Sequence, residues 1–130
     1  MMLNSRRMRL KIAIFAALVC VPEAGKIMAH HSFAMFDREH PIEIAGTVKE
    51  FRWVSPHTVI VIEVKGKDGT ITNWTLEGGT PSLLRRSGIT AKSLKPGDEV
   101  VVKVNPLHSG EPGGTWQVVK FSDGRLLAPQ

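Results

Sequence analysis

Two adjacent histidines, His30 and His31, are the residues of this chain whose position most directly suggests chemistry. They follow a segment with the pattern of a removable leader, so cleavage near residue 29 would place a histidine at the new N-terminus or next to it. A deprotonated α-amino group and an imidazole nitrogen a few atoms away can bind one metal ion together. The pair therefore predicts a metal site at the start of the mature chain.

Residues 1 to 29 have the three parts of a signal peptide. A basic start is followed by ten uninterrupted apolar residues at positions 12 to 21, and then by a more polar exit that ends at Ala29. An apolar run of this length is too short to cross a bilayer as a helix, which needs about 20 residues. We therefore expect export to the periplasm, removal of the leader and no membrane insertion afterwards.

The position of the cut decides which residue becomes the N-terminus. Ala29 is a small residue suited to the last position before the cut, but Ile27 is bulkier than the usual pattern allows two positions earlier. Cuts after Met28 or near Ala24 therefore stay open. Cys20 does not favour a lipoprotein anchor, because a valine precedes it where a small residue is normally required.

Removal of the leader changes the bulk chemistry of the chain. Residues 30 to 130 keep 12 of the 17 basic residues and 11 of the 12 acidic residues, so their net charge is +1. A nucleic-acid partner is not expected, because it needs a clustered basic surface. The one cysteine leaves with the leader, which excludes disulfides and cysteine-ligated zinc in the mature chain. All five histidines remain.

The apolar residues after position 41 recur mostly with a period of two, which predicts β-strands. Asp68 and Gly69 tolerate the backbone angles of a tight hairpin turn between the second and third strands. Thr80 as cap, Pro81 at the first position and Gly88 as stop predict one short helix. The expected elements are strands at 42–48, 59–64 and 71–76, a helix at 82–87, strands at 99–104 and 115–121, and a short edge at 125–127.

Three strands, a short helix and two further strands form the element order of the five-stranded OB-type barrel. We therefore expect an all-β domain over residues 42–130, with a small sandwich or another open barrel as the alternative. Residues 30–41 carry more apolar and aromatic side chains than a free tail usually has. This N-terminal arm is expected to pack on the barrel.

One end of the barrel is expected to collect unusual side chains. Pro56 sets the turn between the first two strands, so His57 should lie at the barrel rim where the second strand begins. Trp74 and Glu77 fall on the third strand, next to a glycine pair, and Trp53 precedes the turn. These residues predict a rim able to hold a ligand.

The chain carries four distinctive motifs: His-His-Ser-Phe-Ala-Met-Phe-Asp from His30, Gly46-x-Val48-x-x-Phe51-x-Trp53-x-x-Pro56-His57, Trp74-x-Leu76-Glu77 and Leu94-Lys95-Pro96-Gly97-Asp98. Together these motifs resemble a bacterial family of small exported domains of unknown function. The resemblance covers nearly all of the mature chain, although members often carry asparagine where this chain has Ser55, which puts any role of that amide in doubt. It implies an exported, barrel-like domain and brings no established activity.

Copper is the metal that the histidine pattern favours. A cut after Ala29 leaves His30 as a chelating N-terminal residue that a further histidine can complete. A cut after Met28 puts His31 third, where the amine, two backbone amides and the imidazole can surround Cu(II) or Ni(II) in a plane. Nitrogen ligands in tetragonal geometry favour Cu(II) in either case.

His57 is the first candidate for the additional ligand. Glu77 is expected to support that histidine without binding the metal itself. Met35, His40 and His108 are secondary candidates, Met35 because a thioether suits Cu(I). The mechanism expected for such a site is sequestration or delivery of the ion.

Two other classes of function stay open. A binding module for a glycan, a peptide or a protein partner would use the rim formed by Trp53, His57, Trp74 and Glu77 without metal. An enzyme is not expected, because no Ser-His-acid motif and no carboxylate pair is recognised. The plainest alternative is structural: the histidine pair is a polar chain start, His57 is a turn residue, and the tryptophans, Trp116 among them, pack the domain.

Overall fold

The computed structural model describes residues 34 to 129. In that range the chain forms six strands and one short helix, in the order expected. The elements are β1 (Ile42–Arg52), β2 (Val59–Lys65), β3 (Ile71–Glu77), α2 (Pro81–Arg86), β4 (Glu99–Pro106), β5 (Gly113–Phe121) and β6 (Leu126–Leu127).

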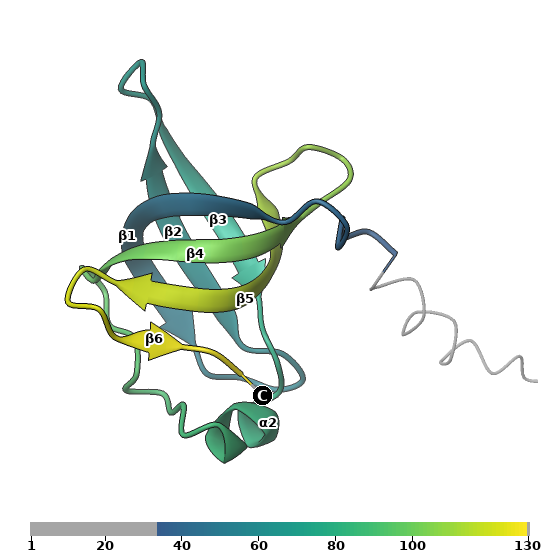
Figure 1. Ribbon diagram of the computed structural model, residues 1–130, viewed down its shortest axis with the longest axis vertical. Coiled ribbons are helices and arrows are strands. Elements are labelled where there is room, and N and C mark those ends of the chain that lie inside the picture. Colours follow the sequence, from purple (N-terminus) through teal and green to yellow (C-terminus); the bar gives the residue numbers. More distant parts are fainter. Residues whose placement is uncertain (1–33, 130) are drawn as a thin grey trace, which may run out of the picture.

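The strands close into a five-stranded barrel (Figure 1). Their order is β3-β2-β1-β4-β5-β6, and an additional parallel pairing joins β3 to β5. The other pairings are antiparallel, including the β1–β2 and β2–β3 hairpins expected from the sequence. Among the described strands, β6 pairs only with β5, at residues 119–120 of that strand. The OB-like barrel is therefore confirmed over the sandwich alternative.

β1 is longer than expected, because it pairs with two different strands along its length. Its residues 42–47 pair with β4, and its residues 47–52 pair with β2 across a bulge after Val48. Gly46 lies where the strand passes from one partner to the other. A β-carbon there would come within 2.5 Å of the Glu63 carbonyl oxygen and of the Ile62 side chain. Glycine lets the neighbouring strand approach this closely.

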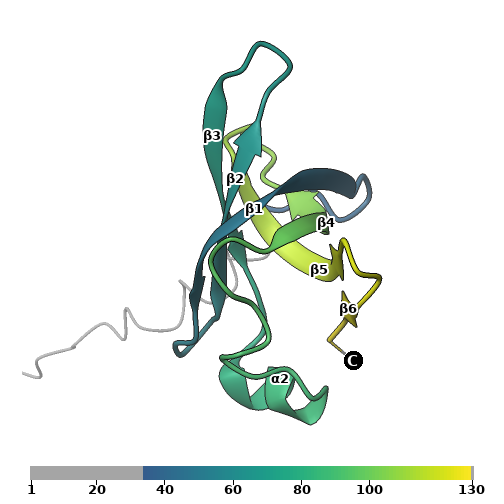
Figure 2. The ribbon, with the colours of Figure 1, turned by 90° about the vertical axis from the view of Figure 1, so that its left-hand side faces the viewer.

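The helix forms for the local reasons that the sequence indicates. The Leu83 amide donates to the Thr80 side-chain oxygen at 3.2 Å, Pro81 is the first helical residue, and Gly88 has φ of +73° beyond the end. α2 lies at one end of the barrel, and the β2–β3 turn extends from the other (Figures 1 and 2). Within residues 34 to 129, no helix is long and apolar enough to cross a membrane.

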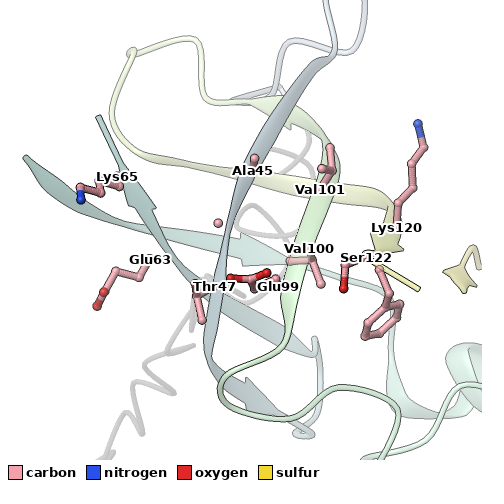
Figure 3. A pocket seen from close by; sticks show the side chains of 11 residues that line it. Ala45, Thr47, Glu63, Lys65, Glu99, Val100, Val101, Lys120 and Ser122 are labelled. Carbon is pink, nitrogen blue, oxygen red and sulfur yellow. The ribbon is translucent and has the colours of Figure 1, made fainter. Parts of the chain in front are cut away.

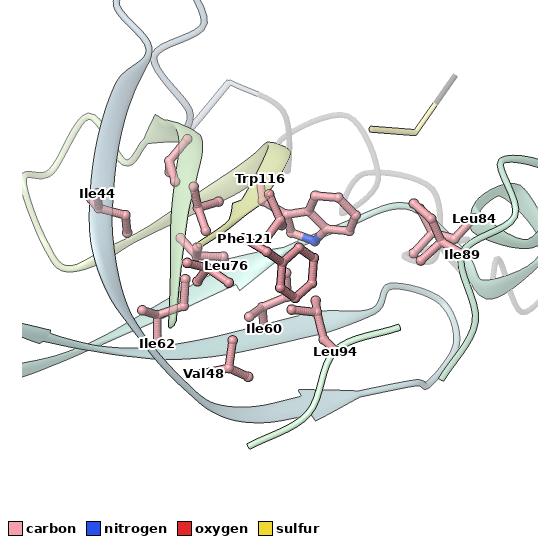
Figure 4. Packing of buried hydrophobic residues seen from close by; sticks show 14 residues of the cluster. Ile44, Val48, Ile60, Ile62, Leu76, Leu84, Ile89, Leu94, Trp116 and Phe121 are labelled. Atoms are coloured by element: carbon pink, nitrogen blue, oxygen red, sulfur yellow. The ribbon is translucent and has the colours of Figure 1, made fainter. Parts of the chain in front are cut away.

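The hydrophobic core runs from the barrel interior to the helix (Figure 4). Ile60, Ile62 and Leu76 from the first hairpins are fully buried, as is Leu84 from α2. The alternation along each strand explains this, since every second side chain points inward. The helix therefore covers one end of the barrel with a buried leucine.

Two neighbouring leucines on α2 provide a matched test of this packing. Leu84 is 0% exposed, whereas Leu83 is 39% exposed. We expect Leu84→Ala to lower the free energy of unfolding by about 2–5 kcal/mol through the lost apolar contacts and the cavity left behind. Leu83→Ala should cost less than about 1 kcal/mol. Urea unfolding of both variants checks this, and equal losses would contradict the assigned role of the helix.

Candidate functional site

The described part of the N-terminal arm, residues 34–41, lies against the end of β4 and the loop that follows it. Phe36 is 7% exposed and forms an isolated bridge with Leu107. The Asp37 amide donates to the Pro106 carbonyl at 2.8 Å, and the His108 amide donates to the Met35 carbonyl at 2.9 Å. The described part of the arm is thus held by backbone hydrogen bonds and a buried aromatic ring.

A pocket of about 390 Å³ opens where the arm, the ends of three strands and the start of α2 meet. Apolar and polar side chains share its walls, as in most small-ligand sites. The lining residues are Phe36, Arg38, His57, Glu77, Gly78, Gly79, Thr80, Leu83, Asn105, Thr115 and Trp116.

His57 and Glu77 are brought together at the pocket although 20 positions separate them. The ring nitrogen Nδ1 of His57 lies 3.3 Å from Oε2 of Glu77, and both side chains are about half-buried. The backbone holds them in register, because Val59 pairs with Glu77 and the Gly78 amide donates to the Thr58 carbonyl at 2.8 Å. A carboxylate on Nδ1 fixes the ring and leaves Nε2 as the nitrogen for another ligand.

Trp116 forms part of the pocket wall and of the core at once. The residue is 5% exposed, and its indole nitrogen Nε1 is buried without a hydrogen-bond partner among the described residues. In Figure 4 its ring lies between the barrel residues and the helix side of the cluster, where Leu84 and Ile89 are found. A β-carbon on Gly78 would overlap Nε1. The glycine backbone therefore lies directly against this unpaired donor.

Asn105 adds a buried polar group to the same pocket. It is 7% exposed, its Nδ2 donates to the Thr115 hydroxyl at 3.0 Å, and its Oδ1 accepts from Nε2 of Gln117 at 2.6 Å. An amide nitrogen carries two protons, so one remains beyond the bond to Thr115. The network fixes the orientation of Asn105 in the wall.

The remaining candidate ligands do not gather around His57 in the described range. His40 is exposed and its Nδ1 lies 3.0 Å from the Asp37 carboxylate, a hydrogen bond that lowers the pKa of Asp37. Met35 is 51% exposed, and His108 is exposed. Residues 34 to 129 contain no group of three or more His, Cys, Asp or Glu side chains placed to hold a metal. His30 and His31 lie outside the described residues.

Trp53 and Trp74 are half-buried and pack against the core, and neither lines this pocket. Trp53 meets Phe51 edge-on at 5.7 Å between ring centroids, and the Arg85 guanidinium lies 5.7 Å from its ring. The aromatic residues that do line the pocket are Phe36 and Trp116. The sequence signal for them was present but unspecific: an apolar arm, and a tryptophan at an inward position of the last long strand.

A second and wider hollow, of about 620 Å³, runs over the outside of β1 and β4 (Figure 3). Its charged side chains are spread along it, with Glu63 and Lys65 on one side of β1, Lys120 on the other and Glu99 between these two groups. Lys120 pairs with Glu43 at 2.9 Å and lowers the pKa of that carboxyl. Such exposed pairs are ordinary surface features. The smaller rim pocket, with its histidine and buried donors, is therefore the candidate site.

The described part of the chain is thus a small closed β-barrel domain with a mixed apolar and polar pocket at its rim. The chain belongs to the family of unknown function DUF6152, which matches residues 17 to 117. This confirms the resemblance to a domain family of unknown function. No curated protein and no solved structure matches the chain.

The glycine pair beside the pocket gives a matched test of its packing. In Gly78→Ala the new methyl group would overlap Nε1 of Trp116 and lie 2.6 Å from the Thr58 hydroxyl oxygen, so we expect a loss of about 1–3 kcal/mol. In Gly79→Ala the nearest atom, at 3.0 Å, is a methyl of the half-exposed Leu83, which can move, so the loss should stay below about 1 kcal/mol. Thermal unfolding compares the two, and a harmless Gly78→Ala would disprove the close contact.

Proposed function

We propose that this protein is exported to the periplasm and binds a transition-metal ion, copper first, at the barrel rim. His57 supplies one imidazole, and the histidines at the mature N-terminus supply the remaining nitrogen ligands. The role of the protein is then to sequester the ion or to deliver it, with no catalytic step.

The contact between His57 and Glu77 is the observation that carries this proposal. Metal-binding histidines commonly place their second ring nitrogen against a carboxylate, which orients the ring and strengthens its donor nitrogen. The 3.3 Å separation of Nδ1 and Oε2 matches that arrangement and leaves Nε2 for the metal. Glu77 is therefore assigned a positioning role.

The N-terminal arm supports the same proposal, because its described part reaches the pocket of His57. Phe36 lines the pocket that His57 also lines. His31 precedes Phe36 by five residues, a stretch of chain that spans at most about 18 Å. N-terminal nitrogen ligands within that reach can join the His57 imidazole on one ion. Such a site would contain three nitrogens or more, the set that copper(II) prefers.

Copper titration of the mature protein tests the proposal, after mass spectrometry has established its first residue. Competition with a chelator of known affinity should show one tight site that His30→Ala and His57→Ala each weaken. Glu77→Gln should weaken it by about 10- to 100-fold, because the ring loses its orienting carboxylate. His108→Ala is the matched control, since His108 is exposed and lies outside the pocket lining.

Two results would contradict this site. An affinity that all four variants share with the parent protein, and that a short histidine-containing peptide reproduces, would rule out a metal site. An affinity that His57→Ala leaves unchanged and His31→Ala abolishes would confine the ion to the N-terminal segment and exclude the rim from it.

A metal-free binding module for a glycan, a peptide or a protein partner is the second candidate function. The observation that favours it is the composition of the pocket, in which apolar Phe36 and Leu83 stand beside the buried polar groups of Asn105 and Trp116. Pockets with this mixture hold organic ligands in many proteins. Binding of an organic compound by metal-free protein distinguishes this function from the first.

A further inference from the structure

The first half of β3 has a free edge among the described strands. β3 pairs with β2 along its whole length, but β5 pairs only with residues 75–77 of β3. In Figures 1 and 2 the first half of β3 belongs to the hairpin that extends beyond the barrel. The Thr75 amide donates to the Pro112 carbonyl, and successive residues of a strand direct their backbone groups to alternate edges. The amides and carbonyls of Ile71 and Asn73 therefore point to an edge where no strand of residues 34 to 129 pairs.

This edge lacks the features by which proteins usually keep sheet edges unpaired. Natural edges carry charged side chains, prolines or bulges, and an exposed apolar edge is a site for another strand. Residues 71–74 contain no charged residue and no proline, and they pair with β2 in continuous register. Ile71 is 58% exposed. The opposite edge of the same hairpin, past its pairing with β1, carries Lys65. The free edge of β3 is therefore suited to an additional strand.

A groove of about 480 Å³ opens beside this edge. Asn73 and Thr75 line one wall from the outer face of β3, because the alternating Trp74 packs against the core. The other walls come from the arm and from the loop between β4 and β5, and they include Met35 and Leu107. The groove thus offers an apolar surface next to unpaired backbone groups.

The charge of the groove indicates which side chains complement it. Two carboxylates, those of Glu77 and Glu111, line it. No Lys, Arg or His side chain of the described residues does so. A basic side chain entering the groove would meet only carboxylates, neutral polar groups and apolar groups. An added strand that carries lysine or arginine is therefore favoured over an acidic one.

We infer that β3 binds an extended, basic peptide segment of a partner protein as an additional strand. The peptide backbone pairs with Ile71 and Asn73. One apolar side chain lies against Met35 and Leu107, and a lysine or arginine side chain reaches Glu111. In such strand addition the main-chain bonds give affinity, and pockets for alternate side chains give specificity. This inference goes beyond the metal site and rests on the second candidate function, for which it names the class of partner.

Hydrogen exchange of the β3 amides tests the inference. The ¹⁵N-labelled mature protein is kept metal-free with a chelator, and the probe is the peptide acetyl-Val-Lys-Val-Lys-Val-amide. One control peptide has glutamate in place of lysine. Another has N-methyl groups on its three central residues, which removes their backbone donors. Exchange and chemical shift are followed at Ile71 and Asn73, and at Thr72 and Trp74, whose amides point to β2.

We expect the lysine peptide to slow exchange at Ile71 and Asn73 and to move both amide protons downfield in a saturable way. Half-saturation should be on the order of millimolar for so short a peptide. The amides of Thr72 and Trp74 should change little, because they already face a paired strand.

Variants of the groove test its charge. Glu111→Gln should raise the half-saturating concentration about two- to fivefold at low salt, because one exposed ion pair is lost. Glu99→Gln is the matched control, since Glu99 is exposed and lies outside the groove lining. Asn73→Arg places a cation in the groove and should abolish the response at Ile71, while urea unfolding verifies that the exposed substitution leaves the fold intact.

The inference fails if no peptide slows exchange at Ile71 and Asn73, or if the glutamate or N-methylated peptide does so as well as the lysine peptide. It also fails if both amides are already protected in the free protein. Protection that depends on protein concentration would then identify a second copy as the occupant, and protection that does not would identify the N-terminal segment of the same chain.

Two further measurements keep the proposals separate. Signals of Leu83 that respond to the peptide while the β3 amides stay unchanged would overturn the strand addition and place the binding module in the rim pocket. Copper titration of the same sample reports the metal site independently, because the peptide experiment is carried out without metal.

Discussion

The closure of the barrel between β3 and β5 is the constraint on which the rest of the structure depends. Residues 75–77 of β3 pair in parallel with residues 113–115 of β5, which joins the first two hairpins to the last strands. Closure brings the backbones close, because a β-carbon on Gly113 would lie 3.3 Å from the Thr75 carbonyl oxygen. It also sets Glu77 opposite Thr115, one residue before Trp116. The core and the rim pocket are therefore two consequences of one pairing.

Trp116 connects the stability of the core with the rim pocket. Its ring contributes apolar area to the core, while its indole nitrogen is buried without a partner in the described chain. Leaving a buried donor without a partner costs about 1–3 kcal/mol. That cost is a large fraction of the free energy of unfolding of a small domain. The backbone of Gly78 lies directly against this nitrogen, where a β-carbon would overlap it.

The arm gives the pocket a wall that the barrel alone does not provide. Phe36 and Arg38 reach the same pocket as His57, and backbone hydrogen bonds hold the described part of the arm along the end of β4 and the loop after it. The segment that precedes this wall carries the histidine pair. In our proposal, removal of the leader thus completes a metal site beside a pocket that is already formed. The membership in a family of unknown function leaves both roles to be established by measurement.

The sequence by itself determined the elements of this protein. Alternation with a period of two located the strands, and Thr80, Pro81 and Gly88 located the helix, because backbone preferences and capping act within a few residues. The sequence also singled out His57 and Glu77, but it grouped them with Trp53 and Trp74 instead of Trp116 and Phe36. Only the tertiary structure decided that grouping. Alternation says which side of a strand a residue faces, whereas strand register and barrel closure decide which distant residues share a pocket, and these depend on contacts across the whole chain.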